Sequence, residues 1–229
     1  MQHVPPAPLD WLVVLPVVIN LMGAAFMLML RAGRRLRPTF AALVVLATLF
    51  FDIVLLGRIL ANGPVSMTMG NWLPPFGISF TADLASAGLA AIAAFVTLLV
   101  IVYAGIERAE GAGPVGFHSL VLLLLAGVSG AFLTGDLFNL YVWFEVMLIA
   151  SFGLLVQGGE PMQLDGALKY GFLNFLATTF FLIALGLLYG LLGTLNMADI
   201  ALVAPKADPT ALAAIGGLLL LAFSIKAGA

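Results

Sequence analysis

Seven long apolar runs follow one another along the 229 residues, separated by short polar segments. A helix needs about 20 apolar residues to cross the hydrocarbon core of a bilayer, and each run approaches or exceeds that length. The pattern predicts an all-α, polytopic transmembrane helix bundle of about seven spans that forms a single domain over residues 1–229. The runs lie at residues 11–30, 39–61, 82–106, 117–134, 137–157, 167–192 and 209–229.

The composition excludes a soluble fold. Hydrophobic residues make up 63% of the chain and charged residues 9%, whereas charged residues make up about 25% of an average globular protein. The absence of cysteine excludes disulfides, thiolate catalysis and thiolate metal ligands. The sequence contains no phosphate-binding loop, zinc motif or nucleophile elbow. We therefore expect no metal, no cofactor and no nucleic-acid partner, and a lipid bilayer around the chain.

Lysine and arginine residues concentrate on one side of the expected bundle. Because cytoplasmic loops carry an excess of these residues, the pattern predicts an N-terminus outside the membrane. Residues 62–80, rich in Gly, Pro and Asn, then form an external turn or short hairpin. The inner loops and helix ends hold Arg31, Arg34, Arg35, Arg37, Arg108 and Lys169, and the outer ones hold Arg58 and Lys206.

Several residues are expected to fix helix ends and helix contacts. Thr81 is a candidate N-cap of the third helix, and Asp136 is a candidate N-cap of the fifth. The short turn at Gly135 and Asp136 predicts that the fourth and fifth helices are antiparallel neighbours. Gly186 and Gly190 match the small-residue pattern of close helix packing.

One carboxylate, Glu145, lies near the middle of the fifth run. At about 1.5 Å per residue it is roughly 12 Å from Leu137, and a charge at that depth costs at least ~2.5 kcal/mol. Among the residues three or four positions away on the same helix, only Tyr141 has a polar tip. The partner of Glu145 is therefore expected on another segment.

Two further charges lie deep in apolar runs. Asp52 is in the second run, and we expect a packing partner for it elsewhere in the bundle. Lys226 is in the last run. An acid and a base inside a membrane mark an ion path more often than a purely structural pair. Desolvation and mutual attraction act oppositely on their proton affinities, so forming or breaking the pair switches both. We predict that Glu145 and Lys226 approach each other, directly or through water, as a proton relay.

A polar stripe runs along the sixth helix. Tyr170, Asn174 and Thr178 recur every four residues and so line one face, and Lys169 lies beside the start of the stripe. Two interpretations remain open. The stripe either forms hydrogen bonds between helices or lines a hydrated proton path from the inner surface, and Lys169 is either an interfacial anchor or part of that path.

Three segments together resemble a known family: TGDLFNLYVWFEVMLIAS, ALKYGFLNFLATTFFLIALGLLYGLLGTLNMADIA and the terminal FSIKAGA. They are similar to the D subunit of Mrp-type multisubunit sodium/proton antiporters. The wider family includes the antiporter-like membrane subunits of complex I and of membrane-bound hydrogenases. The resemblance is strong from about Trp72 to the end of the sequence and is only compositional before that.

The resemblance implies a role for three residues. A glutamate on the fifth span and a lysine on a broken seventh span form a coupled proton-transfer pair in this family, and these match Glu145 and Lys226. A lysine at the inner start of the sixth span matches Lys169. Family members carry about fourteen spans in two inverted repeats, the arrangement common in transporters. The seven runs would then be the first half of such a subunit.

The expected function is that of a proton-translocating membrane subunit of a multisubunit Na⁺/H⁺ antiporter in the prokaryotic cell membrane. Such a transporter subunit is not an enzyme, and its partners are protons, Na⁺ and the other membrane subunits. The alternatives are a proton-pumping membrane subunit of an NADH:quinone oxidoreductase or membrane-bound hydrogenase, and a truncated, non-transporting fragment. A retinal-binding pump is disfavoured because the third run carries no carboxylate apart from Asp83 at its outer end.

Overall fold

A computed structural model describes residues 9–29, 36–72, 75–107 and 116–228. Each predicted apolar run contains one helix, so the predicted all-α transmembrane bundle is confirmed. Five of these helices are long and apolar enough to cross a membrane, and α1 and α4 are shorter apolar helices. The helices are α1 (Leu15–Met29), α2 (Leu36–Asn62), α3 (Leu84–Glu107), α4 (Phe117–Phe132), α5 (Leu137–Leu155), α6 (Pro161–Leu192) and α8 (Pro209–Ala227).

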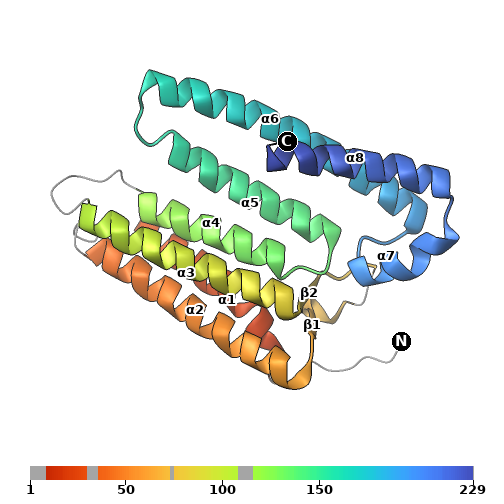
Figure 1. Cartoon of the computed structure of the whole chain (residues 1–229), viewed down its shortest axis with the longest axis horizontal. Coiled ribbons are helices and arrows are strands. Elements are labelled where there is room, and N and C mark those ends of the chain that lie inside the picture. Colours follow the sequence, from red (N-terminus) through yellow and green to blue (C-terminus); the bar gives the residue numbers. More distant parts are fainter. Residues whose placement is uncertain (1–8, 30–35, 73–74, 108–115, 229) are drawn as a thin grey trace.

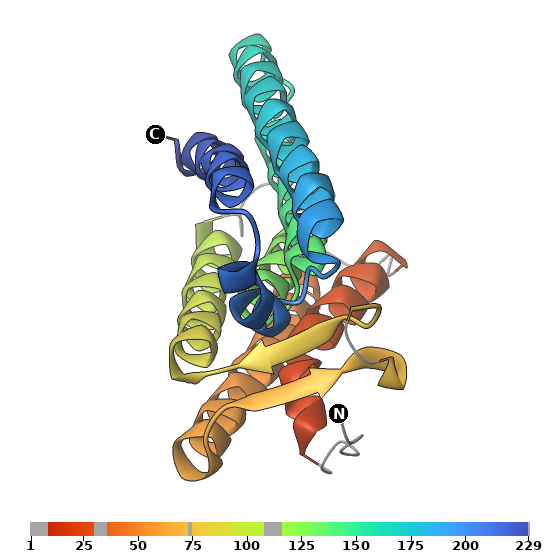
Figure 2. The ribbon, with the colours of Figure 1, turned by 90° about the vertical axis from the view of Figure 1, so that its right-hand side faces the viewer.

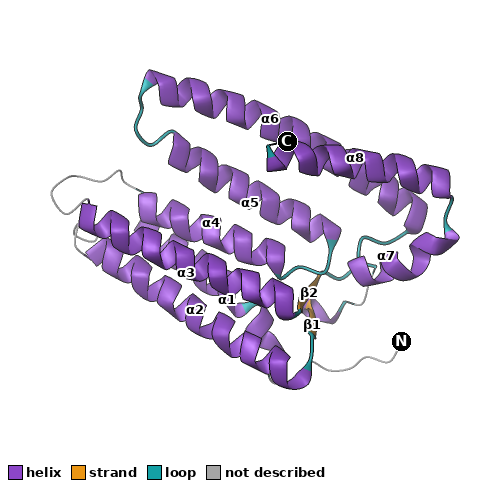
Figure 3. Cartoon of the chain, in the orientation of Figure 1, coloured by secondary structure: helices purple, strands orange, loops and turns teal. Residues whose placement is uncertain are grey.

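The helices form two groups that meet at α4 and α5 (Figure 1). In the first group, α1 packs against α2 and α4, and α3 packs against the same two helices. In the second group, α5 packs on α4, α6 packs on α5, and α8 packs on α6. Helices make up nearly all of the regular structure, and the two strands lie together at one end of the bundle (Figure 3).

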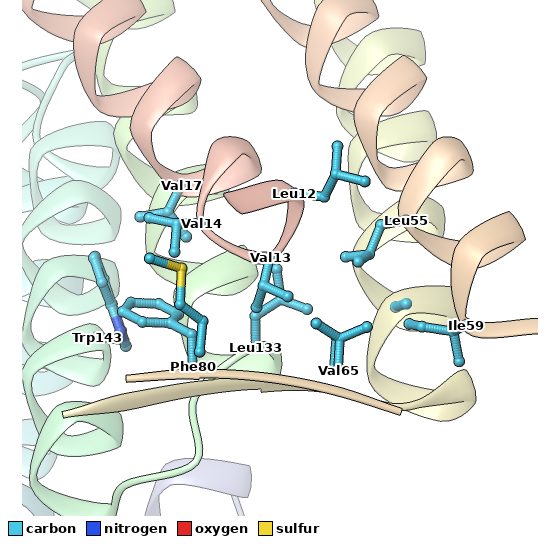
Figure 4. Packing of buried hydrophobic residues seen from close by; sticks show 13 residues of the cluster. Leu12, Val13, Val14, Val17, Leu55, Ile59, Val65, Phe80, Leu133 and Trp143 are labelled. Carbon is cyan, nitrogen blue, oxygen red and sulfur yellow. The ribbon is translucent and has the colours of Figure 1, made fainter. Parts of the chain in front are cut away.

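A cluster of buried apolar residues fills the end of the first group, between α1, α2 and the strands (Figure 4). It includes Val13, Leu55, Phe80 and Trp143. Lipid is as apolar as these side chains, so close packing, rather than exclusion of water, holds membrane helices together. Gly130 on α4 shows such packing, because a Cβ at this position would overlap the indole ring of Trp143 on α5.

The predicted hairpin is present, and its external position stays a prediction. β1 (Val65–Thr68) pairs antiparallel with β2 (Ser79–Ala82), and Figure 2 shows the two strands lying across the helix ends. Backbone hydrogen bonds continue from the two strands into the loops that join the helices. The Gly135 amide donates to the carbonyl of Ser79 at 2.8 Å, and the Leu137 amide donates to the carbonyl of Leu195 at 2.9 Å. We call residues 65–68, 79–82, 133–137 and 195–197 the loop ladder.

The helix caps agree only in part with the sequence analysis. Asp136 caps α5 as predicted, because its carboxylate accepts a hydrogen bond from the Asn139 amide at 2.9 Å. The prediction for Thr81 is wrong, since Thr81 lies in β2 and its amide donates to Leu133. Asp83 replaces it, accepting from the Ser86 amide at 2.7 Å. Hydrogen bonds from the backbone and hydroxyl of Ser86 hold the pKa of the Asp83 carboxyl below its usual range.

The sixth helix is longer than predicted. It begins at Pro161 rather than at residue 167, because Glu160 and Gln163 form a capping box and Pro161 suits the first helical position. A short helix that was not predicted, α7 (Met197–Val203), follows it. The predicted close packing of Gly186 and Gly190 is wrong within the part of the chain that the structure describes, where a Cβ on either residue would meet open space.

The orientation of the bundle can be tested by single cysteines, because the chain has no native cysteine. Ser66 is an exposed residue of β1, and Arg34 belongs to the arginine-rich segment outside the described residues. We expect an impermeant thiol reagent added to intact cells to label Ser66→Cys and to leave Arg34→Cys unlabelled until the membrane is opened. Labelling of position 34 from outside would reverse the orientation.

Candidate functional site

Glu145 has a partner on another helix, as its position on α5 predicts. The side chain is half-buried and faces α6. Its Oε1 atom accepts a hydrogen bond from the Thr178 hydroxyl at 2.8 Å. Thr178 is itself buried, with 7% of its surface exposed. The polar stripe of α6 therefore does make a hydrogen bond between helices at this residue.

Lys226 reaches the same hydroxyl from α8. Its Nζ atom donates to Thr178 Oγ1 at 3.2 Å and lies 5.2 Å from the centre of the Phe144 ring. A hydroxyl has one proton to donate and lone pairs that accept. Thr178 can therefore donate to the carboxylate and accept from the ammonium group at the same time. The predicted approach of Glu145 to Lys226 takes this form, with the Thr178 hydroxyl as the bridge between them.

A cluster of aromatic rings lies beside the bridge, with Phe144 next to Lys226. Phe181 contacts Tyr141, Phe144 and Phe223, with ring centres 6.1, 5.8 and 5.2 Å apart. These rings come from α5, α6 and α8, the same three helices that supply the polar groups. Apolar walls weaken screening, so the charges of Glu145 and Lys226 interact more strongly here than they would in water.

The three polar residues meet although they lie at different distances from the starts or ends of their helices. Counted at about 1.5 Å per residue, Glu145 is roughly 12 Å from Leu137, whereas Lys226 is roughly 25 Å from Pro209. The start of α8 extends beyond the start of α5 at the end of the bundle near α7 (Figure 1). This offset brings Lys226 level with Glu145.

The other residues of the predicted path do not join the bridge. Lys169 forms an ion pair with Asp165, one turn earlier on α6, with 2.6 Å between Nζ and Oδ2, and both side chains are exposed. The Asn174 amide group donates to the backbone carbonyl of Tyr170 at 3.0 Å. The contribution of Phe144 and the Asp165 pairing were both missed from the sequence. The spacing of four residues between Asp165 and Lys169 was a usable signal for the second.

Asp52 lacks the packing partner that the sequence analysis expected. It lies on α2 with no exposed surface, and neither carboxylate oxygen has a hydrogen-bond partner in the described part of the chain. Arg58, on the same helix, is committed elsewhere, because it bonds the Asp10 carboxylate at 2.8 Å and the Leu9 carbonyl at 2.9 Å. Within the described ranges, no three His, Cys, Asp or Glu residues gather as metal ligands.

The fold and the site together define a class of protein: a multi-pass membrane protein with an acid and a base joined between its helices. Residues 134–229, which contain all three bridge residues, match the family model described as "NADH:quinone oxidoreductase/Mrp antiporter, TM". This match confirms the resemblance inferred from the three sequence segments.

The particular relatives are antiporter subunits. The chain is 38% identical to the Na(+)/H(+) antiporter D subunit of Bacillus subtilis over 94% of its own length and 44% of the relative. It is also 38% identical to a Rhizobium meliloti protein described as a probable K(+)/H(+) antiporter D subunit, over 96% of this chain and 42% of that protein. The Mrp complex of a Dietzia species contains a chain of similar structure, with a TM-score of 0.84, 31% identity and coverage of 96% and 41%. The chain thus spans less than half the length of these relatives.

Proposed function

We propose that this chain is part of a proton-translocating membrane subunit of a multisubunit monovalent-cation/proton antiporter, and that Glu145, Thr178 and Lys226 carry a transferable proton. The observation that carries this proposal is the hydroxyl bridge, in which Thr178 Oγ1 is within hydrogen-bond distance of both the acid and the base. Sodium is the cation that we propose is exchanged for protons, because the Bacillus subtilis relative is named as a Na(+)/H(+) antiporter subunit.

The bridge has the direction that a relay requires. Lys226 donates toward Thr178, and Thr178 donates toward Glu145. If the ammonium group passes a proton to the hydroxyl oxygen while the hydroxyl proton moves to the carboxylate, the result is a neutral amine, an intact hydroxyl and a neutral carboxylic acid. The attraction between Glu145 and Lys226 ends with that transfer, so the next movement of a proton is coupled to the separation of the helices.

Lys169, Tyr170 and Asn174 form the proposed path toward the bridge. They lie on α6 between its start and Thr178, and Lys169 is exposed where a proton would enter. The ion pair with Asp165 holds this lysine at the start of the path. Movement along the path to Thr178 needs water, since the Asn174 side chain already bonds within its own helix.

The proposed partners are other membrane subunits and lipid. Large apolar side chains of α6 remain exposed in this chain, which is the surface that helices of neighbouring subunits or lipid tails would cover. They include Leu168, Phe172, Phe175, Leu182, Ile183 and Leu187. The matching family also includes membrane subunits of NADH:quinone oxidoreductase. A proton-pumping subunit of that kind is therefore the second candidate function.

Thr178→Val tests the bridge. Valine keeps the shape of threonine but removes the hydroxyl, so we expect proton exchange by the assembled complex in vesicles to fall about tenfold or more, an increase in barrier of at least about 1.4 kcal/mol. Thr178→Ser restores the hydroxyl and should restore exchange.

The neighbouring Thr179 offers a matched control. Its side chain is exposed and, among the described residues, bonds only the Phe175 carbonyl of its own helix, at 2.9 Å. Thr179→Val should therefore leave exchange unchanged. Equal exchange by Thr178→Val and wild type would show that the hydroxyl takes no part in transfer.

A further inference from the structure

A second buried acid lies in the first helix group, away from the bridge. Asp52 is inside α2, at about 1.5 Å per residue roughly 15 Å from Asn62 and 24 Å from Leu36. None of its surface is exposed, and both oxygens lack a hydrogen-bond donor among the described residues. Asp52 belongs to the buried stripe of α2, which comprises Ala41, Val45, Thr48, Asp52, Leu55 and Ile59.

Two more buried oxygens on neighbouring helices are also without a partner in the described ranges. They are Asn20 Oδ1 on α1 and Ser129 Oγ on α4, and both residues have no exposed surface. The Asn20 amide nitrogen is satisfied, because it donates to the Pro16 carbonyl at 2.7 Å. Buried polar atoms in proteins are nearly always hydrogen-bonded, so four such oxygens on three packed helices need an explanation.

The packing places these three residues within about one helical turn of one another along the bundle. A Cβ on Gly23 of α1 would meet Val44 on α2 and Leu122 on α4, which fixes the register of the three helices. Both neighbours run antiparallel to α1, as the shared clusters at the two ends of these helices show. The residues level with Pro16, two turns before Gly23, therefore lie about two turns after Val44 and Leu122. They are Asp52 on α2 and Ser129 on α4. Asn20 lies one turn away, on the same buried face of α1.

No described charge compensates Asp52 from the surrounding helices. α1 carries no ionisable residue, α4 carries only His118 near its far end, and the only acid or base of α3 is Glu107, its last residue. At the end of α2, Arg58 and Asp10 bond each other. An isolated carboxylate in such surroundings is strongly disfavoured, and the group instead binds a proton and becomes neutral.

We propose that Asp52 is a buried proton-binding site, in which internal water links the neutral acid to Asn20 and Ser129, since neither residue hydrogen-bonds Asp52 directly. One proton on Asp52, together with internal water, gives all four oxygens a partner. Through water, the acid O–H donates toward Asn20 Oδ1, and the Ser129 hydroxyl donates toward the other Asp52 oxygen. The site does not include Glu145 or Lys226, and the proposal does not depend on the proposed function.

Infrared spectroscopy of the assembled, reconstituted complex tests the proposal. A neutral carboxylic acid has a carbonyl stretch apart from the carboxylate and amide bands, and this band shifts in heavy water. We expect such a band at neutral pH and its loss in Asp52→Asn. The same comparison in a Glu145→Gln background separates it from any signal of Glu145. Thr48→Val, one turn away and buried, is the matched control, because Thr48 bonds only the Val44 carbonyl, and it should keep the band.

A second pair of variants keeps the test decisive if Asp52→Asn does not assemble. Ser129→Ala and Asn20→Leu leave Asp52 in place but remove its proposed partners, so each should shift the band to higher frequency. A spectrum that is unchanged by Asp52→Asn, or a band that does not move in either partner variant, would overturn the proposal. Unchanged proton exchange in Thr178→Val, which would reject the proposed relay, would leave this result unaffected.

Discussion

Glu145→Gln is expected to abolish proton exchange while the complex still assembles. Glutamine has the size of glutamate, and its amide oxygen can still accept from the Thr178 hydroxyl, as Glu145 does at 2.8 Å. The amide cannot take up the transferred proton. Loss of a group that accepts a proton in the rate-limiting transfer typically costs about 10²-fold to 10⁴-fold, and we expect a loss of at least about 10²-fold here. Glu145→Asp keeps the acid but shortens its reach, so partial activity should remain.

The measurement is cation-driven proton movement in inverted vesicles, with the amount of assembled complex determined in parallel. Glu160→Gln is the matched control, because it makes the same chemical change at an exposed acid that caps α6. Exchange should be normal in this control. Exchange at the wild-type rate by Glu145→Gln would remove Glu145 from the relay.

The largest effect on assembly is expected from reversing one charge of the bridge. Glu145→Lys would place two ammonium groups beside Thr178, and Lys226→Glu would place two carboxylates there. Leaving a buried charge without its opposite costs about 3–5 kcal/mol, so each single variant should lose assembly or transport. The double variant restores one charge of each sign. The Thr178 hydroxyl can turn to donate to the carboxylate introduced on α8 and accept from the ammonium group introduced on α5, so assembly or partial transport should return.

Recovery in the double variant is the decisive comparison, because two independent defects would add rather than cancel. Assembly is measured by the yield of intact complex, and transport by proton movement in vesicles. A double variant that is no better than the worse single variant would show that the two charges do not act as a pair.

The helix bundle could be predicted from the sequence because length and apolar composition alone decide whether a segment suits a membrane. The start of α6 could not, because its first turn is polar and the apolar pattern begins only later. The cap of α3 was misplaced for a different reason. Thr81 and Asp83 are both good caps by residue type, and only the pairing of Thr81 in the strand excludes it.

The members of the site were more predictable than their contacts. Glu145 and Lys226 stood out because deep charges are rare, and Thr178 stood out through the spacing of its stripe. The bridge itself depends on how α5, α6 and α8 slide along one another, and no local pattern encodes that offset. Asp52 shows the opposite case. Its depth was evident from the sequence, but the expected packing partner makes no direct hydrogen bond to it in the described ranges, and the helix beside it, α1, carries no charge.

The loop ladder anchors one end of the helices that carry the bridge. It fixes α5 at Leu137 and α6 through Leu195, three residues beyond its end. When a rigid helix tilts about one end, each residue moves in proportion to its distance from that end. Taking α5 as rising about 1.5 Å per residue, a tilt of about 10° would move Glu145 by roughly 2 Å and Leu155 by roughly 5 Å. The smaller movement is enough to break the hydrogen bond to Thr178. The larger one would separate the end of α5 from the neighbouring helices, at the end of the bundle far from the strands.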